Sequence, residues 1–231
     1  MFRQLLEGVS RRLPSRCAVC HGWPRHPICD DCVGEFAQPV HRCMLCALPI
    51  PAGLARCGAC IRKPPPWDAA LAAVPYAFPW PGLVQDFKFH QQPAWATAFA
   101  TLMRSAPWVE PALEAAEVVI PLPLSAQRLQ MRGFNQSWEL ARRLAPAKAR
   151  ADLLLRIRDT PPQSSLPRQE RLRSVQGAFA PEPRYQPGLR GQRVVLVDDV
   201  MTSGASLQAA SAVLRSAGVD HLTVLVFART E

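Results

Sequence analysis

Apolar residues follow two different periods in the C-terminal two-thirds of the chain. Short runs that are almost entirely apolar, such as residues 194–197 and 222–228, alternate with stretches in which apolar residues recur every three or four positions. Uninterrupted apolar runs are typical of strands covered on both faces, and the wider spacing is typical of amphipathic helices. The pattern predicts an α/β domain with a mostly parallel sheet flanked by helices.

The same periods predict the individual elements. We expect strands at residues 69–78, 117–120, 194–197 and 222–228. We expect helices at residues 83–89, 95–103, 135–144 and 207–214, the last one closed by Gly218. Ligands of parallel α/β sheets bind beyond the carboxyl ends of the strands. Polar side chains that follow these strands are therefore the first candidates for a functional site.

Before this domain, the chain contains a cysteine-rich segment. All eight cysteines lie within residues 17–60, and they form four CxxC pairs: Cys17/Cys20, Cys29/Cys32, Cys43/Cys46 and Cys57/Cys60. Such pairs are typical two-ligand knuckles of a tetrahedral metal site, so we expect about two structural Zn²⁺ ions held by four thiolates each. Redox chemistry or an iron–sulfur cluster are the alternatives.

The pairing of the knuckles stays open at this point. Successive pairing closes one site from the first two knuckles and another from the last two, with short loops. Interleaved pairing is the alternative. The segment has few large apolar residues, so the metal replaces a hydrophobic core, and chelation is expected to unfold it.

These patterns divide the chain into four parts. Residues 17–63 form the expected double zinc ribbon, residues 64–68 a proline-rich linker, and residues 69–231 the α/β domain. Residues 1–16 form an expected N-terminal helix whose apolar stripe consists of Phe2, Leu5, Leu6, Val9 and Leu13. We expect this stripe to dock on the protein, with a membrane-surface helix as the alternative.

Composition limits the function classes. The formal net charge is +9, which favours anionic partners. Bound as thiolates, the cysteines with two Zn²⁺ would reduce that charge by about half. The excess of arginine over lysine also fits a GC-rich genome. No apolar run approaches the ~20 residues of a membrane span, and the first residues lack an export signal, so we expect a soluble cytoplasmic protein.

The strongest candidate site follows the strand at residues 194–197. Asp198 and Asp199 leave the strand together, and the turn Thr202, Ser203, Gly204, Ala205 and Ser206 opens the next helix. Free N–H groups at a helix N-terminus attract phosphate, and carboxylates suit ribose hydroxyls, directly or through Mg²⁺. The combination predicts a sugar-phosphate site; an ordinary strand, turn and helix capped by Ser206 is the alternative.

The run VVLVDDVMTSGAS, residues 194–206, resembles the phosphoribosyl pyrophosphate (PRPP) signature of type I phosphoribosyltransferases. The resemblance implies a type I phosphoribosyltransferase-like fold. It also implies that the two acids take the ribose role as catalytic residues, and that residues 202–206 form the phosphate cradle of a PRPP and Mg²⁺ site.

The resemblance extends over nearly the whole chain from Cys17 onward. The four knuckles, the run PLPLSAQRLQMRGFNQ at residues 121–136 and the run QSSLPRQERLRSVQGAF at residues 163–179 together resemble the ComF family, which includes GntX proteins. This implies a double zinc ribbon joined to a phosphoribosyltransferase domain, and a role with other competence proteins in the uptake of transforming DNA. Ser174 stands where the family commonly has Asn, so any role of that Asn is not carried over.

Three basic side chains are further candidates for PRPP binding. Arg128 and Arg132 precede Gly133 after a strand, so they can converge on a pyrophosphate, or else lie on an exposed helix. The family resemblance makes Lys88 a phosphate-site candidate, and a surface lysine is the alternative. The arginine-rich segment at residues 156–173 fits a flap over a polyphosphate, or a solvated connection.

Two functions of different classes remain. In a phosphoribosyltransferase, an acceptor displaces pyrophosphate at C1 of the ribose, and the protein supplies positioning and electrostatics. Nothing in residues 66–117 identifies that acceptor. The alternative is an adaptor that binds single-stranded DNA through basic charge and stacking without turnover. Its candidate aromatic residues are Trp23, Trp67, Trp80, Trp95, Trp108 and Trp138.

Overall fold

A computed structural model describes residues 16–23, 26–89, 92–159 and 175–231. The expected N-terminal helix lies almost entirely outside the described residues. The greater part of the expected flap, with Arg168, Arg171, Arg173 and Ser174, lies outside them as well.

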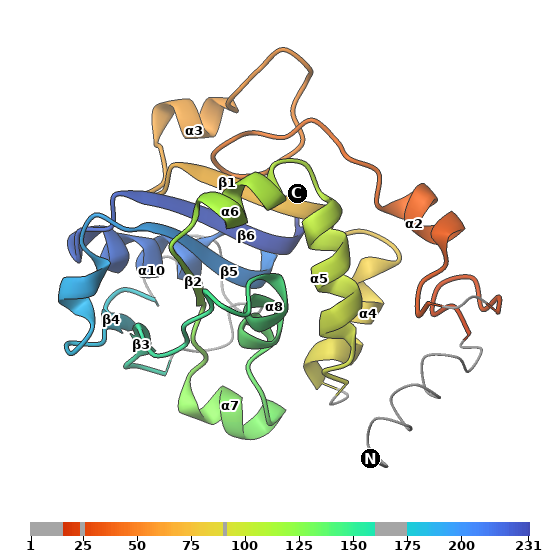
Figure 1. Cartoon of the computed structure of the whole chain (residues 1–231). Coiled ribbons are helices and arrows are strands. Elements are labelled where there is room, and N and C mark those ends of the chain that lie inside the picture. Colours follow the sequence, from red (N-terminus) through yellow and green to blue (C-terminus); the bar gives the residue numbers. More distant parts are fainter. Residues whose placement is uncertain (1–15, 24–25, 90–91, 160–174) are drawn as a thin grey trace.

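A four-stranded parallel sheet forms the centre of the molecule, in the order β1-β6-β5-β2 (Figure 1). The strands are β1 (Ala69–Pro75), β2 (Val118–Pro121), β5 (Arg193–Met201) and β6 (His221–Arg229). Parallel pairing places all four carboxyl ends at one edge, as the apolar runs predicted.

Side chains of β5 and β6 alternate between two hydrophobic clusters, one on each face of the sheet. Val195 and Val197 contribute to the first cluster, and Val194 and Leu196 to the second. The first is covered by α4 (Trp80–Phe89), α5 (Trp95–Ser105), α6 (Val109–Ala115) and α8 (Gln136–Leu144). The second is covered by α10 (Ala205–Ser216) with the hairpin of β3 (Leu154–Arg156) and β4 (Phe179–Pro181).

The α/β architecture is confirmed, and the element bounds differ in places. β5 continues to Met201, so the two acids lie within the strand rather than after it. The sequence periods did not indicate α6 or the β3–β4 hairpin, because elements of three to seven residues are too short to show a period. Gly218 follows α10 with φ 91°, as expected of a helix-terminating glycine.

The cysteine-rich segment contains two short helices, α2 (Asp30–Phe36) and α3 (Gly58–Arg62). It packs directly on the α/β domain. Trp67, within the expected linker, is 5% exposed, and Asp68 accepts hydrogen bonds from the Arg215 side chain and from the Leu222 backbone N–H. Within the described residues, no helix is long and apolar enough to cross a bilayer.

Candidate functional site

The acid pair lies near the carboxyl end of β5, and helices α4 and α8 supply partners to the two side chains. Asp199 is buried on the face covered by α4, and Lys88 Nζ lies 2.9 Å from its Oδ2 atom. Sequence analysis predicted Lys88 as a phosphate-site residue; the structure places it against this carboxylate. One of the two negative charges is thus balanced by an internal cation.

Asp198 has a different environment. The Ser137 hydroxyl donates to Asp198 Oδ1 at 2.8 Å, and the Asp199 backbone N–H donates to the same atom at 2.9 Å. Burial, followed by repulsion from Asp199, raises the pKa of Asp198 to about 7 against the opposing effects of Lys88 and Ser137. Sequence reasoning missed Ser137, although its polar side chain on the buried face of a helix was an available signal.

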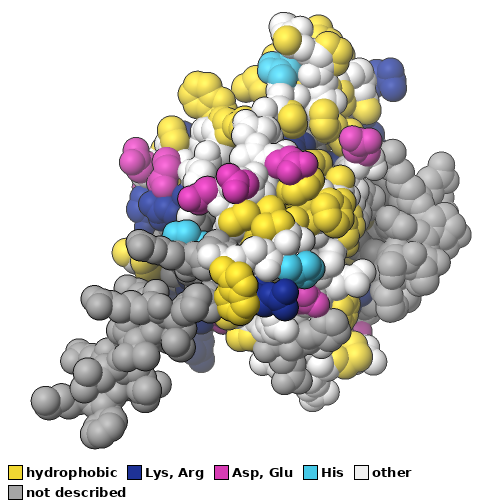
Figure 2. Space-filling view, turned by 90° about the vertical axis from the view of Figure 1, so that its right-hand side faces the viewer, with side chains coloured by type: hydrophobic (Ala, Val, Ile, Leu, Met, Phe, Trp, Pro, Cys, Tyr) yellow, Lys and Arg dark blue, Asp and Glu magenta, His cyan; other side chains and the backbone are white. Residues whose placement is uncertain are grey.

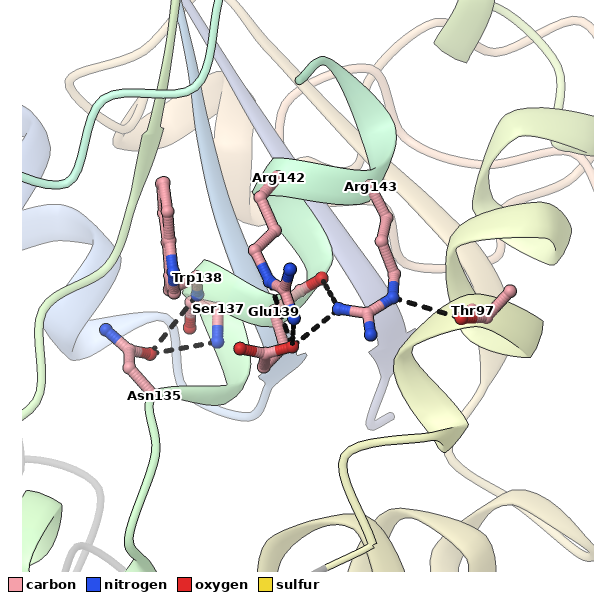
Figure 3. Close-up of polar contacts among 7 residues, drawn as sticks. All are labelled: Thr97, Asn135, Ser137, Trp138, Glu139, Arg142 and Arg143. Atoms are coloured by element: carbon pink, nitrogen blue, oxygen red, sulfur yellow. Dashed lines mark hydrogen bonds and ion pairs between the residues drawn. The ribbon is translucent and has the colours of Figure 1, made fainter. Parts of the chain in front are cut away.

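Helix α8 brings Ser137 to this position, and Asn135 fixes where α8 begins. The Asn135 side-chain oxygen accepts from the backbone N–H groups of Ser137 at 2.9 Å and Trp138 at 3.4 Å (Figure 3). Its amide nitrogen donates to the carbonyl of Leu122 at 3.1 Å, just beyond β2. The cap therefore ties the start of α8 to the sheet edge that carries the acids.

A second network fixes the rest of α8. Glu139 is buried, and it lies between Arg142 and Arg143, both of which donate to its carboxylate (Figure 3). Burial raises its pKa, but the two arginines outweigh that effect and lower it overall. Arg143 also donates from Nε to Thr97 Oγ1 of α5 at 3.0 Å. Helix α8 is thereby fixed against α5.

Arginine side chains converge near the acids from two elements. Arg128 and Arg132 lie on α7 (Ala126–Arg132), which Gly133 ends with φ 77°, so the structure shows the helix that was the alternative interpretation. Arg156 extends from β3 and interacts electrostatically with both Arg128 and Asp198. Burial, followed by repulsion from Arg128, lowers the pKa of Arg156 to about 10. Such concentrated positive charge favours a polyanion.

Gln136 places a hydrogen-bond donor beside Arg132. It is 2% exposed, and its side-chain oxygen accepts from Arg132 at 2.9 Å. Its Nε2 atom is buried without a hydrogen-bond partner among the described residues. A buried unpaired donor costs free energy, and a ligand oxygen would satisfy it.

The turn of residues 202–206 connects β5 to α10. Gly204 has φ 74°, a left-handed conformation that side chains disfavour, and it caps the helix. Thr202, Ser203 and Ser206 are partly exposed, and the Ser203 hydroxyl accepts from the Ala205 N–H at 3.4 Å. The turn thus presents hydroxyl groups and the N-terminus of a twelve-residue helix at the sheet edge that carries the acids.

The eight cysteines form two separate clusters. Cys17, Cys20, Cys29 and Cys32 form the Cys17 cluster, and Cys43, Cys46, Cys57 and Cys60 form the Cys43 cluster. Within each cluster all sulfur atoms lie within 4.8 Å of one another, which agrees with successive pairing of the knuckles. Four thiolates fill a tetrahedral sphere and leave no position for a reacting water, so both clusters fit structural zinc ribbons.

The sulfur geometry fits the metal. The sulfur atoms of Cys20 and Cys29, and those of Cys46 and Cys57, are 3.6 Å apart, close to the roughly 3.8 Å expected for Zn–S bonds of about 2.3 Å. Burial raises the pKa of Cys17, but backbone N–H groups outweigh it and lower the pKa to about 6. The thiolate, the form that binds metal, is thus favoured at Cys17, whereas burial raises the pKa of Cys32 in the same cluster.

Comparison with known proteins agrees with this geometry. Residues 129–230 match the family model described as phosphoribosyl transferase domain. The DNA utilization protein YhgH of Salmonella typhimurium is 30% identical over 227 residues, covering 94% of this chain and 98% of that protein. The competence protein F of Haemophilus influenzae is 29% identical over 225 residues, covering 93% and 96%. The homologue in Escherichia coli K12, also named DNA utilization protein YhgH, is 28% identical over 232 residues.

A parallel sheet with paired acids and a hydroxyl-rich turn at its carboxyl edge defines a protein with a phosphoribosyltransferase domain. The two four-cysteine clusters and the similarity along nearly the whole chain make the assignment more specific. The chain belongs to the ComF family, with the YhgH and competence protein F homologues.

The pairing of the knuckles can be tested by zinc content. Purified protein is expected to contain about two zinc ions per chain. The double variant Cys20→Ser/Cys29→Ser disrupts one cluster and should retain about one zinc, whereas Cys20→Ser/Cys46→Ser disrupts both. Elemental analysis distinguishes the variants. If Cys20→Ser/Cys29→Ser loses more zinc than Cys20→Ser/Cys46→Ser, interleaved pairing is supported instead. Iron in place of zinc would contradict the choice of metal.

The raised pKa of Asp198 predicts a pH-dependent cost to stability. A carboxyl group whose pKa rises on folding stabilises the folded protein while it is protonated. That stability is lost as the pH rises from the pKa of the unfolded chain, near 4, through the pKa in the folded protein, about 7. Asp198→Asn removes that ionisation, so it should stabilise the protein at pH 8 by on the order of 2 kcal/mol and by less at pH 5. Thermal unfolding at both values, with the exposed Asp220→Asn as control, measures this. An advantage that does not grow with pH would refute the assignment.

Proposed function

We propose that the protein binds PRPP together with Mg²⁺ at the carboxyl edge of the sheet, in the cytoplasm, and acts in the handling of imported DNA. The observation that carries this proposal is the acid pair of β5 directly followed by the turn of residues 202–206, with arginines gathered beside Asp198. The names of the homologues support the connection with DNA.

Each part of the ligand would have a matching group. The 5′-phosphate fits the turn, whose hydroxyls and helix N-terminus donate hydrogen bonds. The ribose hydroxyls fit the acid pair. The pyrophosphate fits Arg128, Arg132 and Arg156. The Nε2 atom of Gln136, which has no partner among the described residues, would donate to one of its oxygens. In this proposal, arginines bind the negatively charged pyrophosphate, and carboxylates accept hydrogen bonds from the ribose hydroxyls.

The residues present also fit Mg²⁺. This ion prefers oxygen ligands and usually binds through one or two carboxylates together with substrate phosphates. Asp198 and Asp199 are the oxygen donors at this edge. The ion would neutralise charge on the pyrophosphate.

Transfer of the phosphoribosyl group is the reaction that this arrangement supports. The bond from C1 to the pyrophosphate oxygen breaks as the acceptor forms a bond to C1, and pyrophosphate leaves with the electron pair. Positive charge develops on the sugar, and the carboxylate of Asp198 would stabilise that charge. The arginines would stabilise the leaving group, and no covalent intermediate with the protein is required.

PRPP with Mg²⁺ is expected to raise the melting temperature of the wild type by several degrees at ligand concentrations about 100-fold above Kd. The double variant Asp198→Asn/Asp199→Asn should lose that rise and keep its fold and zinc content. Asp30→Asn/Asp31→Asn is a matched control, because it changes two adjacent, exposed acids on α2. Undiminished stabilisation of the first variant would refute the site. Pyrophosphate release with candidate acceptors then tests transfer.

A second candidate function is binding of single-stranded DNA without turnover. Trp23 is 71% exposed, and the Arg16 guanidinium lies 5.6 Å from its ring, a combination that suits base stacking beside a phosphate. Trp67 and Trp80 are buried and cannot serve in this way. Among the described residues on the face in Figure 2, acidic side chains lie next to hydrophobic ones, and Lys and Arg side chains form no continuous patch.

For this second function, oligonucleotide affinity should fall steeply with salt and survive the double Asp198/Asp199 substitution. Trp23→Ala should weaken binding about tenfold, because stacking contributes roughly 1–3 kcal/mol per base. Trp108→Ala, at another tryptophan that is 75% exposed, is the matched control. Fluorescence anisotropy measures the affinity, and equal binding by Trp23→Ala and wild type would exclude this role of Trp23.

A further inference from the structure

The Cys43 cluster lies beside the turn of residues 202–206, and hydrogen bonds connect the two. We propose that this metal site positions the phosphate-binding turn, so that metal occupancy of the Cys43 cluster and phosphoribosyl binding are energetically coupled. The proposal rests on the proposed function, because the ligand is the one assigned to that turn. Arg229 and Trp67 act as the positioning residues.

The knuckle between Cys43 and Cys46 is the part of the ribbon that contacts the α/β domain. Three successive carbonyl groups of this knuckle accept hydrogen bonds from that domain: Met44 from the Ala70 N–H at 2.7 Å, Leu45 from Trp67 Nε1 at 2.6 Å, and Cys46 from Arg229 Nε at 2.7 Å. The sulfur atoms of Cys43 and Cys46 would hold the metal, so the metal would fix the direction of these carbonyls. Loss of the metal would release all three contacts together.

Arg229 joins the knuckle to the turn through one planar group. It is the last residue of β6, and it is 7% exposed beside Met201 at the end of β5. While Nε bonds the Cys46 carbonyl, Nη1 donates to the carbonyls of Met201 at 3.0 Å and Thr202 at 2.8 Å. A guanidinium is rigid, and its charged hydrogen bonds are strong where water is excluded. Displacement of the Cys46 carbonyl therefore disturbs the first residue of the turn.

Trp67 forms a second connection, independent of Arg229. Its side chain is buried, and one edge of the indole donates to the Leu45 carbonyl. Its Cη2 atom lies 3.7 Å from where a Cβ on Gly204 would stand, so the ring packs against the cap of α10. Ala47, which directly follows the knuckle, packs in the same hydrophobic cluster as Met201 and Ala205. The knuckle and the turn thus share one packed core.

The Cys17 cluster provides a contrast within the same chain. Cys17 and Cys32 belong to the hydrophobic cluster on the opposite face of the sheet, with Trp80 and Phe87. Trp80 Nε1 donates to the carbonyl of Phe36 at 3.1 Å, just as Trp67 does to Leu45. Replacement of either tryptophan by phenylalanine removes one indole N–H that holds a zinc ribbon. Only Trp67 also contacts the turn.

Coupling between two sites is reciprocal in free energy. If the metal favours the ligand-binding form of the turn, the ligand must favour metal retention by the same factor. Ribose 5-phosphate and PRPP–Mg²⁺ should therefore slow zinc release from one of the two clusters. The other cluster, remote from the turn, should be unaffected.

The test compares full-length wild type with Arg229→Lys, Trp67→Phe and Trp80→Phe. A chromogenic zinc chelator follows metal release with and without ribose 5-phosphate, and calorimetry measures PRPP–Mg²⁺ affinity. In the wild type, one of two release phases should slow about tenfold with ligand. Arg229→Lys and Trp67→Phe should weaken PRPP binding about tenfold and abolish that protection. Trp80→Phe should retain both.

The outcomes separate this inference from the proposed function. Suppose that the wild type, Arg229→Lys and Trp67→Phe bind PRPP equally well, and that the rate of zinc release is the same with and without ligand. The coupling is then refuted, and the proposed function stands. If the wild type binds neither PRPP nor ribose 5-phosphate, both are refuted. Where a variant fails to fold, the ligand dependence of zinc release from the wild type decides the question alone.

Discussion

Parallel pairing of β5 with β6 is the constraint on which the rest of the structure depends. The register sets Met201 beside Arg229, and it brings the acids, the turn and the guanidinium to one edge of the sheet. Both strands are covered on both faces, so a shift of one residue would misplace the apolar side chains and also Asp198 and Asp199. Ser137 and Lys88 would then lose their carboxylate partners. The packing of the apolar strand residues is therefore what sets the chemistry at the strand ends.

Several charged groups at the site have an unfavourable electrostatic free energy in the folded protein. Burial raises the pKa of Asp198, and burial together with repulsion from Arg128 lowers the pKa of Arg156, so charges of both signs are desolvated near one another. Such groups are costly in the free protein, and they are matched by a ligand that carries complementary charge. The buried Nε2 atom of Gln136, which has no hydrogen-bond partner in the part of the chain that the structure describes, is a further costly group of this kind.

Sequence patterns predicted the fold class, the strand and helix order around β5, and metal binding by the four CxxC knuckles, because those features depend on local periodicity and on fixed cysteine spacing. The pairing of the knuckles stayed open until the structure placed the sulfur atoms. They could not predict Ser137 beside Asp198 or Arg229 beside Cys46, since 61 and 183 residues separate these partners. They also treated residues 64–68 as a linker. The prolines before Trp67 indicate a linker in the sequence. Its contacts with Leu45 and Gly204 depend on how the knuckle packs, so only the structure shows them.

The contact between Lys88 and Asp199 has a consequence for the order in which ligands arrive. An ammonium group already occupies the position beside this carboxylate, so a bare divalent cation approaching the edge meets one compensated acid and a nearby group of arginines. A cation that arrives already complexed to a polyphosphate carries net negative charge, and the same arginines attract it. Under the proposed function, the edge would therefore favour the metal–polyphosphate complex over the free ion.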